Sequence, residues 1–390
     1  MFPVSIKERF NLSPTIHFLN CATRGPFTKA VEQAGIAVIQ DFTPAIHQIK
    51  PDHFFEQAWV VRKLFSDLVH NPDPQRIAVV PSVSYAMAIM ARNLHRKKGI
   101  KAGQHILMIS EEFPSDVYAW ERVCKELSLT IKTIQKPKTE NVASDWNAQI
   151  LENISADTAL VVLPHVHWQH GTKFDLENIS KRCKKTGTLF AIDGTQSVGA
   201  MDLDIGKIKP DLLVVAAYKW LMGPYSAGLV YLGEFFDDGI PIEETWMGRL
   251  ESNQFHKLTD YQAIYQPKAY RYNMGQHSQF IQMPMLETAI REKLEWGVNN
   301  IQTHCEELWQ KPIQQLSKLG VRFGSEQHRA YHLVGLELPE GTDSMKVIEK
   351  LAERKVIVAA RGTSIRVSPN IYNTEADMEA LVAAFSEVMT

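Results

Sequence analysis

The chain has 390 residues, of which 45% are hydrophobic and 22% are charged, and its formal net charge at pH 7 is −2. This length allows a large buried core and predicts two domains. The near-neutral charge gives no electrostatic basis for binding nucleic acid or an anionic membrane, and no apolar run approaches the ~20 residues of a membrane-spanning helix.

The N-terminal residues 1–20 carry charges and lack the apolar core of a signal peptide. The four cysteines are scattered without the spacing of a metal site, at Cys21, Cys124, Cys183 and Cys305. Thiols in such an arrangement are typical of a reducing compartment, so we expect a cytoplasmic protein.

Short apolar segments alternate with amphipathic segments through the middle of the chain. The expected strands lie at residues 77–80, 105–109, 130–134, 159–163, 189–192, 212–216 and 228–231, and helices are expected at 84–97, 118–127 and 176–186. This alternation predicts an α/β fold with a mostly parallel seven-stranded sheet between helices.

The pattern changes after residue 282. A strongly helical stretch covers residues 287–319, followed by expected strands at 321–323, 331–338 and 356–360 and by expected helices at 344–354 and 374–389. We therefore divide the chain into an N-terminal arm (1–20), a large domain (21–282) and a smaller α+β domain (283–390).

Two side chains near the ends of neighbouring strands indicate a cofactor site. Asp193 closes one apolar segment, and Lys219 follows the next one at a turn rich in glycine and proline. A lysine after a strand is usually solvated and an aspartate usually caps a helix, but this turn lies between two buried elements. Pyridoxal 5′-phosphate (PLP) needs both groups, an amine for a Schiff base and an acid that keeps the pyridine nitrogen protonated.

In such a sheet, ligands bind beyond the carboxyl ends of the strands. The first expected strand ends in Ser82-Val83-Ser84, where a turn that opens a helix can present N–H groups and hydroxyls to a phosphate. Taken alone, a helix N-cap is the commoner explanation of such serines. Phe113 follows the second strand, where its ring could cover one face of a flat cofactor or belong to the core.

Three histidines follow the fourth expected strand, at His165, His167 and His170. Because histidine is a common zinc ligand, histidines this close together could indicate a zinc site. We do not adopt it, because the loop contains no carboxylate or thiol and matches no established metal motif.

The stretch around Asp193 and Lys219 resembles the signature of the class V aminotransferase family, a branch of the fold-type I PLP-dependent enzymes. The family pattern is Asp-Gly-x-Gln at a strand end, an aspartate at the start of the next strand, and Lys-Trp-Leu-x-Gly-Pro. The chain has Asp193-Gly194-Thr195-Gln196, Asp211 and Lys219-Trp220-Leu221-Met222-Gly223-Pro224. The resemblance extends over residues 20–385.

This resemblance implies a role for each matched residue around the cofactor. Lys219 would form the Schiff base, Asp193 would contact the pyridine nitrogen and Gln196 the ring hydroxyl. Val83 and Ser84 occupy the position of the family's phosphate cup, so we favour phosphate contacts from both.

Two departures from the common pattern are similar to kynureninases. Tyr218 stands where many relatives carry histidine, and a tyrosine there would contact the cofactor phosphate. Phe113 begins the run Phe-Pro-Ser-Asp, which implies that its ring stacks on the cofactor and that Asp116 makes a polar contact nearby.

The substrate side is implied by segments from three parts of the chain. The run from Arg366 to Thr374 is very similar to a family segment whose arginine holds the substrate α-carboxylate, a task that suits the guanidinium fork. Asn20 lies in a segment that resembles the substrate-side N-terminal loop. His167 and Trp168 lie in a loop that lines the active site in the family, so both are candidates to meet the substrate.

Two further segments imply a homodimer with composite active sites. The run Arg271-Tyr272-Asn273-Met274-Gly275-Gln276 resembles Arg-Phe-Glu-x-Gly-Thr, which reaches the phosphate of a neighbouring chain, with Gln276 in place of threonine. Trp246 resembles a kynureninase tryptophan near the phosphate.

These motifs predict chemistry at the Cα of an amino acid through an external aldimine. We expect an aminotransferase first, and an isopenicillin N epimerase-like epimerase or a kynureninase-like lyase as alternatives; kynureninases tend to carry histidine at the position of Gln196. A cysteine desulfurase is disfavoured because residues 357–365, ahead of Arg366, contain no cysteine.

Other classes of protein fit less well. The chain has neither the Gly-x-Gly-x-x-Gly of a nicotinamide dehydrogenase nor the Gly-x-x-x-x-Gly-Lys-Ser/Thr of a nucleotide hydrolase. A non-catalytic regulatory protein of PLP-enzyme fold is disfavoured because Lys219, Asp193 and Arg366 are all present.

Overall fold

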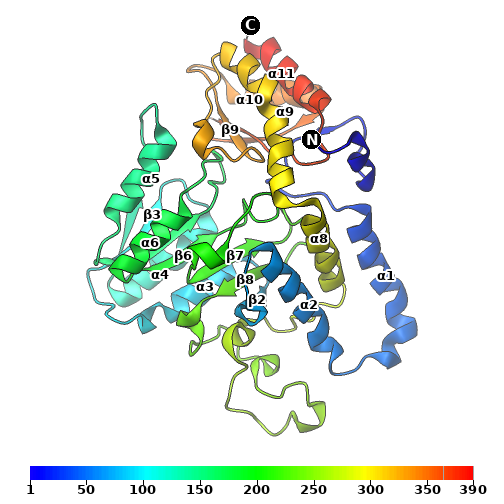
Figure 1. Cartoon of the computed structure of the whole chain (residues 1–390), viewed down its shortest axis with the longest axis vertical. Coiled ribbons are helices and arrows are strands. Elements are labelled where there is room, and N and C mark those ends of the chain that lie inside the picture. The colour runs from blue at the N-terminus through cyan, green and yellow to red at the C-terminus, as the bar shows by residue number, and fades with distance from the viewer. Residues whose placement is uncertain (363, 390) are drawn as a thin grey trace.

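A seven-stranded sheet forms the centre of the computed structural model, which describes residues 1–362 and 364–389 (Figure 1). Its strands are β2 (Ile77–Val80), β3 (His105–Ile109), β4 (Thr130–Ile134), β5 (Thr158–Pro164), β6 (Leu189–Asp193), β7 (Leu212–Ala216) and β8 (Gly228–Leu232). They run in the order β2-β8-β7-β6-β5-β3-β4, and only β8 is antiparallel to its neighbours. The prediction of a mostly parallel seven-stranded α/β sheet is confirmed.

Helices cover both faces of this sheet (Figure 1). They are α2 (His53–Leu68), α3 (Val83–Asn93), α4 (Tyr118–Leu127), α5 (Val142–Asn153), α6 (Leu176–Thr186), α7 (Ile205–Ile208) and α8 (Gln282–Trp296). Helix α1 (Lys29–Ala45) packs against α8. Because side chains alternate along a strand, Val161 and Leu163 of β5 enter one core with α2, α5, α6 and α8, whereas Leu160 and Val162 enter the other with α3 and α4.

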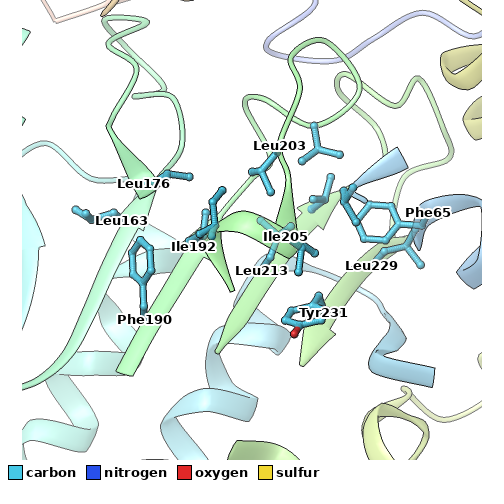
Figure 2. Close-up of a cluster of buried hydrophobic side chains, with 14 of the residues drawn as sticks. Phe65, Leu163, Leu176, Phe190, Ile192, Leu203, Ile205, Leu213, Leu229 and Tyr231 are labelled. Carbon is cyan, nitrogen blue, oxygen red and sulfur yellow. The ribbon is translucent and has the colours of Figure 1, made fainter. Parts of the chain in front are cut away.

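Figure 2 shows part of the first of these cores, in which Phe65 of α2 packs with side chains of the central strands, including Ile192, Leu213 and Leu229. These side chains are fully buried, and burial of each stabilises the fold by roughly 1.5–3 kcal/mol. Such packing holds the strands in a rigid frame, so the residues just beyond their carboxyl ends have defined positions.

The C-terminal part of the chain forms a second group of elements with its own core, at the top of Figure 1. Its elements are α9 (Val298–Lys318), β9 (Val334–Glu337), α10 (Ser344–Glu353), β10 (Val356–Ile357), β11 (Ala359–Arg361), β12 (Ser364–Val367) and α11 (Glu375–Met389). Strands β11, β12 and β9 form an antiparallel sheet, and β10 pairs with β1 (His17–Phe18) near the N-terminus. The N-terminal arm is thereby tied to the C-terminal elements.

Some elements differ from the expectation. The single helical stretch is two helices, because Gly297 adopts a φ of 75° and separates α8 from α9. The strand expected at 321–323 is absent from the described structure, where Arg322 only bridges Glu337. Helices α1, α2, α5 and α7 and strands β1 and β12 were not among the expected elements. The domain division at Gln282 stays a prediction; α8, which begins there, packs Met283 and Leu286 into the core of the large sheet.

The described residues contain no helix that is long and apolar enough to cross a membrane.

Candidate active site

A cavity of ≈ 480 Å³ opens at the strand ends where the sequence places the cofactor. Its lining includes the predicted residues Val83, Ser84, Phe113, Trp168, Asp193, Gln196, Tyr218 and Lys219. They come from the ends of β2, β3, β5, β6 and β7, so the topology brings together residues that are far apart in the sequence.

Lys219 lies at a tight turn between β7 and β8. The turn is closed by backbone hydrogen bonds from Ala217 N–H to the Ala227 oxygen and from Gly223 N–H to the Ala217 oxygen, both 2.9 Å. The side chain is 9% exposed. Burial lowers the pKa of the Lys219 amine to about 8, with Asp193 acting against this shift and Arg366 adding to it. A substantial share of the amine is therefore neutral and nucleophilic near neutral pH.

The N-terminal loop packs directly on this turn through Gly25. Its N–H donates to the Tyr218 carbonyl oxygen at 2.9 Å. A Cβ at residue 25 would lie 2.1 Å from the Lys219 carbonyl oxygen, closer than atoms can approach. Glycine is therefore required here to hold the loop against the lysine.

Three carboxyl groups gather opposite the lysine. Asp193, at the end of β6, accepts a hydrogen bond from Thr195 N–H at 2.8 Å. Burial raises the pKa of Asp116 well above its ordinary value, and the nearby Asp193 and Glu112 raise it further. Burial also raises the pKa of Glu112 to about 8. Asp116 and Glu112 are therefore mainly protonated near neutral pH.

The start of α3 faces the cavity with two hydroxyls. Ser82 caps the helix by accepting from Tyr85 N–H at 3.2 Å, and its hydroxyl lies 2.9 Å from that of Ser84. The N-cap interpretation is thus correct for Ser82. Val83 and Ser84, in the first turn, line the cavity with the positive end of the helix dipole behind them.

Aromatic rings form another part of the cavity wall. Phe113 and Trp168 meet edge to face, with ring centroids 5.5 Å apart. The Lys219 amine lies 5.5 Å from the Phe113 ring and 5.7 Å from the Tyr218 ring. Phe113 is 37% exposed, so it faces the cavity and is not a core residue.

Gln196 is held in place from two sides. Its side-chain oxygen accepts from the Trp220 indole N–H at 2.8 Å, and its amide nitrogen donates to the Ala22 oxygen at 3.2 Å. One amide hydrogen stays available on the side that lines the cavity.

The substrate-side residues Arg366, Trp168 and Asn20 are linked in one network. The buried Arg366 guanidinium donates to the Trp168 carbonyl oxygen at 3.0 Å and to the Thr23 hydroxyl at 2.7 Å. Thr23 in turn donates to the Asn20 side-chain oxygen at 2.7 Å. The sequence motifs did not single out Thr23, because only the fold brings it to the arginine.

Six predicted residues do not line this cavity, and the buried Arg366 is one of them. His167 is buried on the other side of its loop, against Trp146 and His170, with ring centroids 5.4 and 4.8 Å away. Asp116 is buried next to Asp193. Asn20 contributes to a neighbouring hollow of ≈ 410 Å³ and reaches the site through Thr23.

Trp246 and Gln276 are also away from the cavity, and both are exposed on the protein surface. Trp246 is 40% exposed and packs edge to face on Phe55 and Phe255. Gln276 has a φ of 59° in a turn before α8. Within one chain, neither residue reaches the predicted phosphate position.

In the folded chain, a carboxylate from another segment lies beside the loop that contains His165, His167 and His170. Glu111, from the end of β3, lies 2.7 Å from His170 Nε2, and one atom of each of Glu111, His167 and His170 falls within 4.8 Å of the others. The two imidazoles are stacked at an interplanar angle of 13°. Rings stacked in this way cannot both direct an in-plane lone pair at one ion, so we assign the loop no metal role.

Glu112 and Thr195 belong to the site but were not predicted. Glu112 immediately precedes Phe113 in the segment after β3, and this position was the available signal in the sequence. The Thr195 hydroxyl accepts from Ala216 N–H at 3.1 Å and joins β6 to β7, a contact that no sequence pattern indicates.

These groups fit PLP. The cavity offers a buried amine of lowered pKa, a carboxylate opposite it, hydroxyls at a helix N-terminus for a phosphate, and an exposed aromatic face for a flat ring. The fold and the cavity together define a fold-type I PLP-dependent enzyme.

Comparison with known proteins identifies the family. A model of the aminotransferase class V family matches residues 44–381, so the chain belongs to this family and is a PLP-dependent enzyme. The uncharacterized aminotransferase YcbU of Bacillus subtilis is 25% identical over 83% of this chain and 81% of that protein. The isopenicillin N epimerase of Streptomyces clavuligerus is 24% identical over 97% of this chain and 96% of that protein.

The fold is shared with solved structures. A cysteine desulfurase from Thermococcus onnurineus NA1 superposes with a TM-score of 0.82 over 100% of this chain and 98% of that chain, at 19% identity. This likeness concerns the fold alone.

Proposed function

We propose that this protein is an aminotransferase that acts at the Cα of an amino acid. The observation that carries the proposal is the position of Lys219, which is buried on the same cavity as Asp193 and as Trp168, whose backbone oxygen accepts a hydrogen bond from Arg366. We assign Lys219 as the base, Asp193 as the carboxylate for the cofactor nitrogen and Arg366 as the guanidinium that binds the substrate carboxylate.

Each residue has a task in the proposed reaction. Arg366 holds the α-carboxylate of the substrate, so that the Cα hydrogen is presented to the lysine. Lys219, with a pKa of about 8, removes and returns the proton at Cα. Bound PLP supplies an electron sink for the charge that develops at Cα, and Asp193 stabilises the positive charge on the ring nitrogen.

Epimerisation is a second candidate. It is supported by the Streptomyces clavuligerus relative, named as an isopenicillin N epimerase, which matches 97% of this chain. A kynureninase-like lyase is supported by Phe113 and Tyr218, both of which line the cavity.

A desulfurase is not proposed. In the described part of the chain, all four cysteines are free and buried, and none of them lines the cavity. Cys21 comes nearest the site through a 4.0 Å contact of its sulfur with the Lys219 carbonyl oxygen, and burial raises the pKa of its thiol. A buried, protonated thiol is a poor nucleophile.

We also propose a homodimer in which Gln276 and Trp246 of one chain complete the phosphate site of the other. Support comes from their surface position and from the segment before α8, which extends away from the body at the bottom of Figure 1. Tyr261 in this segment is 91% exposed, as expected of an interface residue in an isolated chain.

The experiment is an absorbance spectrum of the purified protein with PLP, followed by titration with L- and D-amino acids. The wild type should show a visible band that Lys219→Ala alters and that Lys207→Ala, at an exposed lysine in α7, leaves unchanged. Formation of the pyridoxamine form establishes transamination, whereas loss of optical activity without it establishes epimerisation. The absence of a visible band after PLP addition would contradict the assignment of Lys219.

A further inference from the structure

A second arginine, Arg361, lies beside Trp168, the cavity residue to which Arg366 is hydrogen-bonded. The guanidinium carbon of Arg361 lies 5.6 Å from the centre of the Trp168 ring. The backbone oxygen of the same tryptophan accepts the 3.0 Å hydrogen bond from Arg366, and its side chain lines the cavity with Lys219. Trp168 is therefore flanked by two guanidinium groups.

The register of the β11–β12 hairpin explains why both arginines are on one side. Ala359 pairs with Arg366, and Arg361 pairs with Ser364. Paired residues of antiparallel strands share a face, and so do residues two apart along one strand. Arg361 and Arg366 are diagonal neighbours on the same face, for which the Cα atoms are typically ~7–8 Å apart.

Neither arginine is neutralised by the protein. In the described part of the chain, no ion pair joins Arg361 or Arg366 to a carboxylate. Arg361 donates to the Ala360 oxygen at 2.7 Å, and the Nε atoms of both side chains are buried without a partner. Buried or half-buried cations without counter-ions are costly, and two close together cost more.

The electrostatic effects agree with this proximity. Burial lowers the pKa of Arg366 to about 9, and Arg361 lowers it further. Arg361 also contributes to the lowered pKa of Lys219. One α-carboxylate can neutralise only one of the two guanidiniums, so a site occupied by a neutral amino acid would retain an unpaired cation.

We infer, on the basis of the proposed function, that the substrate is an amino acid with a second acidic group, which Arg361 binds while Arg366 binds the α-carboxylate. The simplest members of this class are the dicarboxylic amino acids. Trp168, between the two arginines, packs on the apolar carbons that separate the acids. Arg361 is thus a specificity-determining residue, and Arg366 serves any amino acid.

The test compares matched substrates on the PLP-loaded protein. The cofactor absorbance is titrated with aspartate, glutamate and α-aminoadipate, and with the neutral analogues asparagine, glutamine and norvaline. The best acidic member should bind about 10- to 100-fold more tightly than its neutral analogue, as expected for a hydrogen-bonded ion pair. Arg361→Gln should remove this preference and leave the affinity for neutral amino acids within about twofold, whereas Arg122→Gln, at an exposed arginine in α4, should change neither.

A second measurement does not depend on the reaction. Glutarate and succinate, which lack an amine, should raise the melting temperature of the PLP-loaded wild type more than butyrate does, and Arg361→Gln should abolish the difference. Equal binding of acidic and neutral amino acids by the wild type would overturn the inference. So would an Arg361→Gln variant that weakens both classes equally. A visible band that responds only to neutral amino acids would overturn it while leaving the proposed function intact, and a band that no amino acid perturbs would overturn both.

Discussion

Asp116 lies next to Asp193, and both carboxyl oxygens of Asp116 are buried without a hydrogen-bond partner in the described protein. Burial raises the pKa of the Asp116 carboxyl well above its ordinary value, and the neighbouring Asp193 raises it further, so Asp116 holds a proton near neutral pH. Glu112, whose pKa burial raises to about 8, is a second such group. The acid end of the cavity therefore takes up protons when the chain folds.

This uptake predicts how the stability of the cofactor-free protein depends on pH. The pKa of Glu112 is about 8 in the folded chain, well above its unfolded value, so the folded state binds more protons than the unfolded state. Its contribution to stability is complete at acidic pH and is lost as the pH rises through about 8. The slope should reach up to about 1.4 kcal/mol per pH unit. Melting temperatures of apoprotein between pH 5 and 9 should decline less in Glu112→Gln than in the wild type or in Glu126→Gln, at an exposed glutamate. Parallel curves for all three proteins would contradict the assignment.

The reactivity of Lys219 should also reveal its surroundings. Because the pKa of its amine is about 8, modification of cofactor-free protein by an amine-selective reagent should show a midpoint near that pH at Lys219 and a higher midpoint at exposed lysines. Arg366→Gln removes a nearby positive charge and should move the Lys219 midpoint upward. Peptide mass spectrometry after short labelling measures both. A midpoint for Lys219 equal to that of the exposed lysines would show that the amine is not desolvated.

The parts of the site that depend on local pattern could be predicted from the sequence. Lys219, Asp193 and Ser84 stand at the ends of apolar strands, and the carboxyl ends of parallel strands converge whatever the loop details are. The bounds of β2, β3, β4 and β7 match the expectation because each is a fully apolar run or follows a clear turn. For such strands, a short apolar run and the turn residues that flank it are sufficient.

The parts that depend on tertiary contacts could not be predicted. Thr23 and Arg366 meet across 343 residues of sequence, and β12, which carries the arginine, is too short to show a period. Val166 and Trp168 line the cavity, whereas the side chain of His167, between them, does not. This difference depends on the conformation of the loop, which the sequence pattern does not indicate.

Gly25 provides a test of the link between the N-terminal loop and the lysine turn. A Cβ at residue 25 would clash with the Lys219 carbonyl oxygen at 2.1 Å, so Gly25→Ala should shift the turn, cost roughly 1–3 kcal/mol of stability and weaken PLP retention. Gly324→Ala is a matched control, since a Cβ there meets no atom within 4 Å. Thermal unfolding and PLP content after dialysis measure both effects. A Gly25→Ala protein that behaves like Gly324→Ala would show that the loop can move away freely.

The proposed dimer makes a prediction about one face of α1. Ile36, Ile39 and Phe42 recur at intervals of three on this helix and are all exposed, with Ile39 at 61%. An exposed apolar stripe of this kind is typical of a subunit interface. Ile39→Glu should therefore convert the dimer to a monomer in sedimentation velocity. Because Gln276 and Trp246 of one chain are proposed to complete the other site, the monomer should also lose PLP affinity.

A control on another surface separates this effect from a general loss of solubility. Met345, on α10, is 57% exposed, and Met345→Glu should sediment as the wild type does and keep its cofactor. Trp246→Ala tests the composite site separately from dimer formation, since it should weaken PLP binding more than it weakens the dimer. A wild type that sediments as a monomer while retaining PLP would exclude composite sites, because Trp246 and Gln276 lie outside the cavity of their own chain.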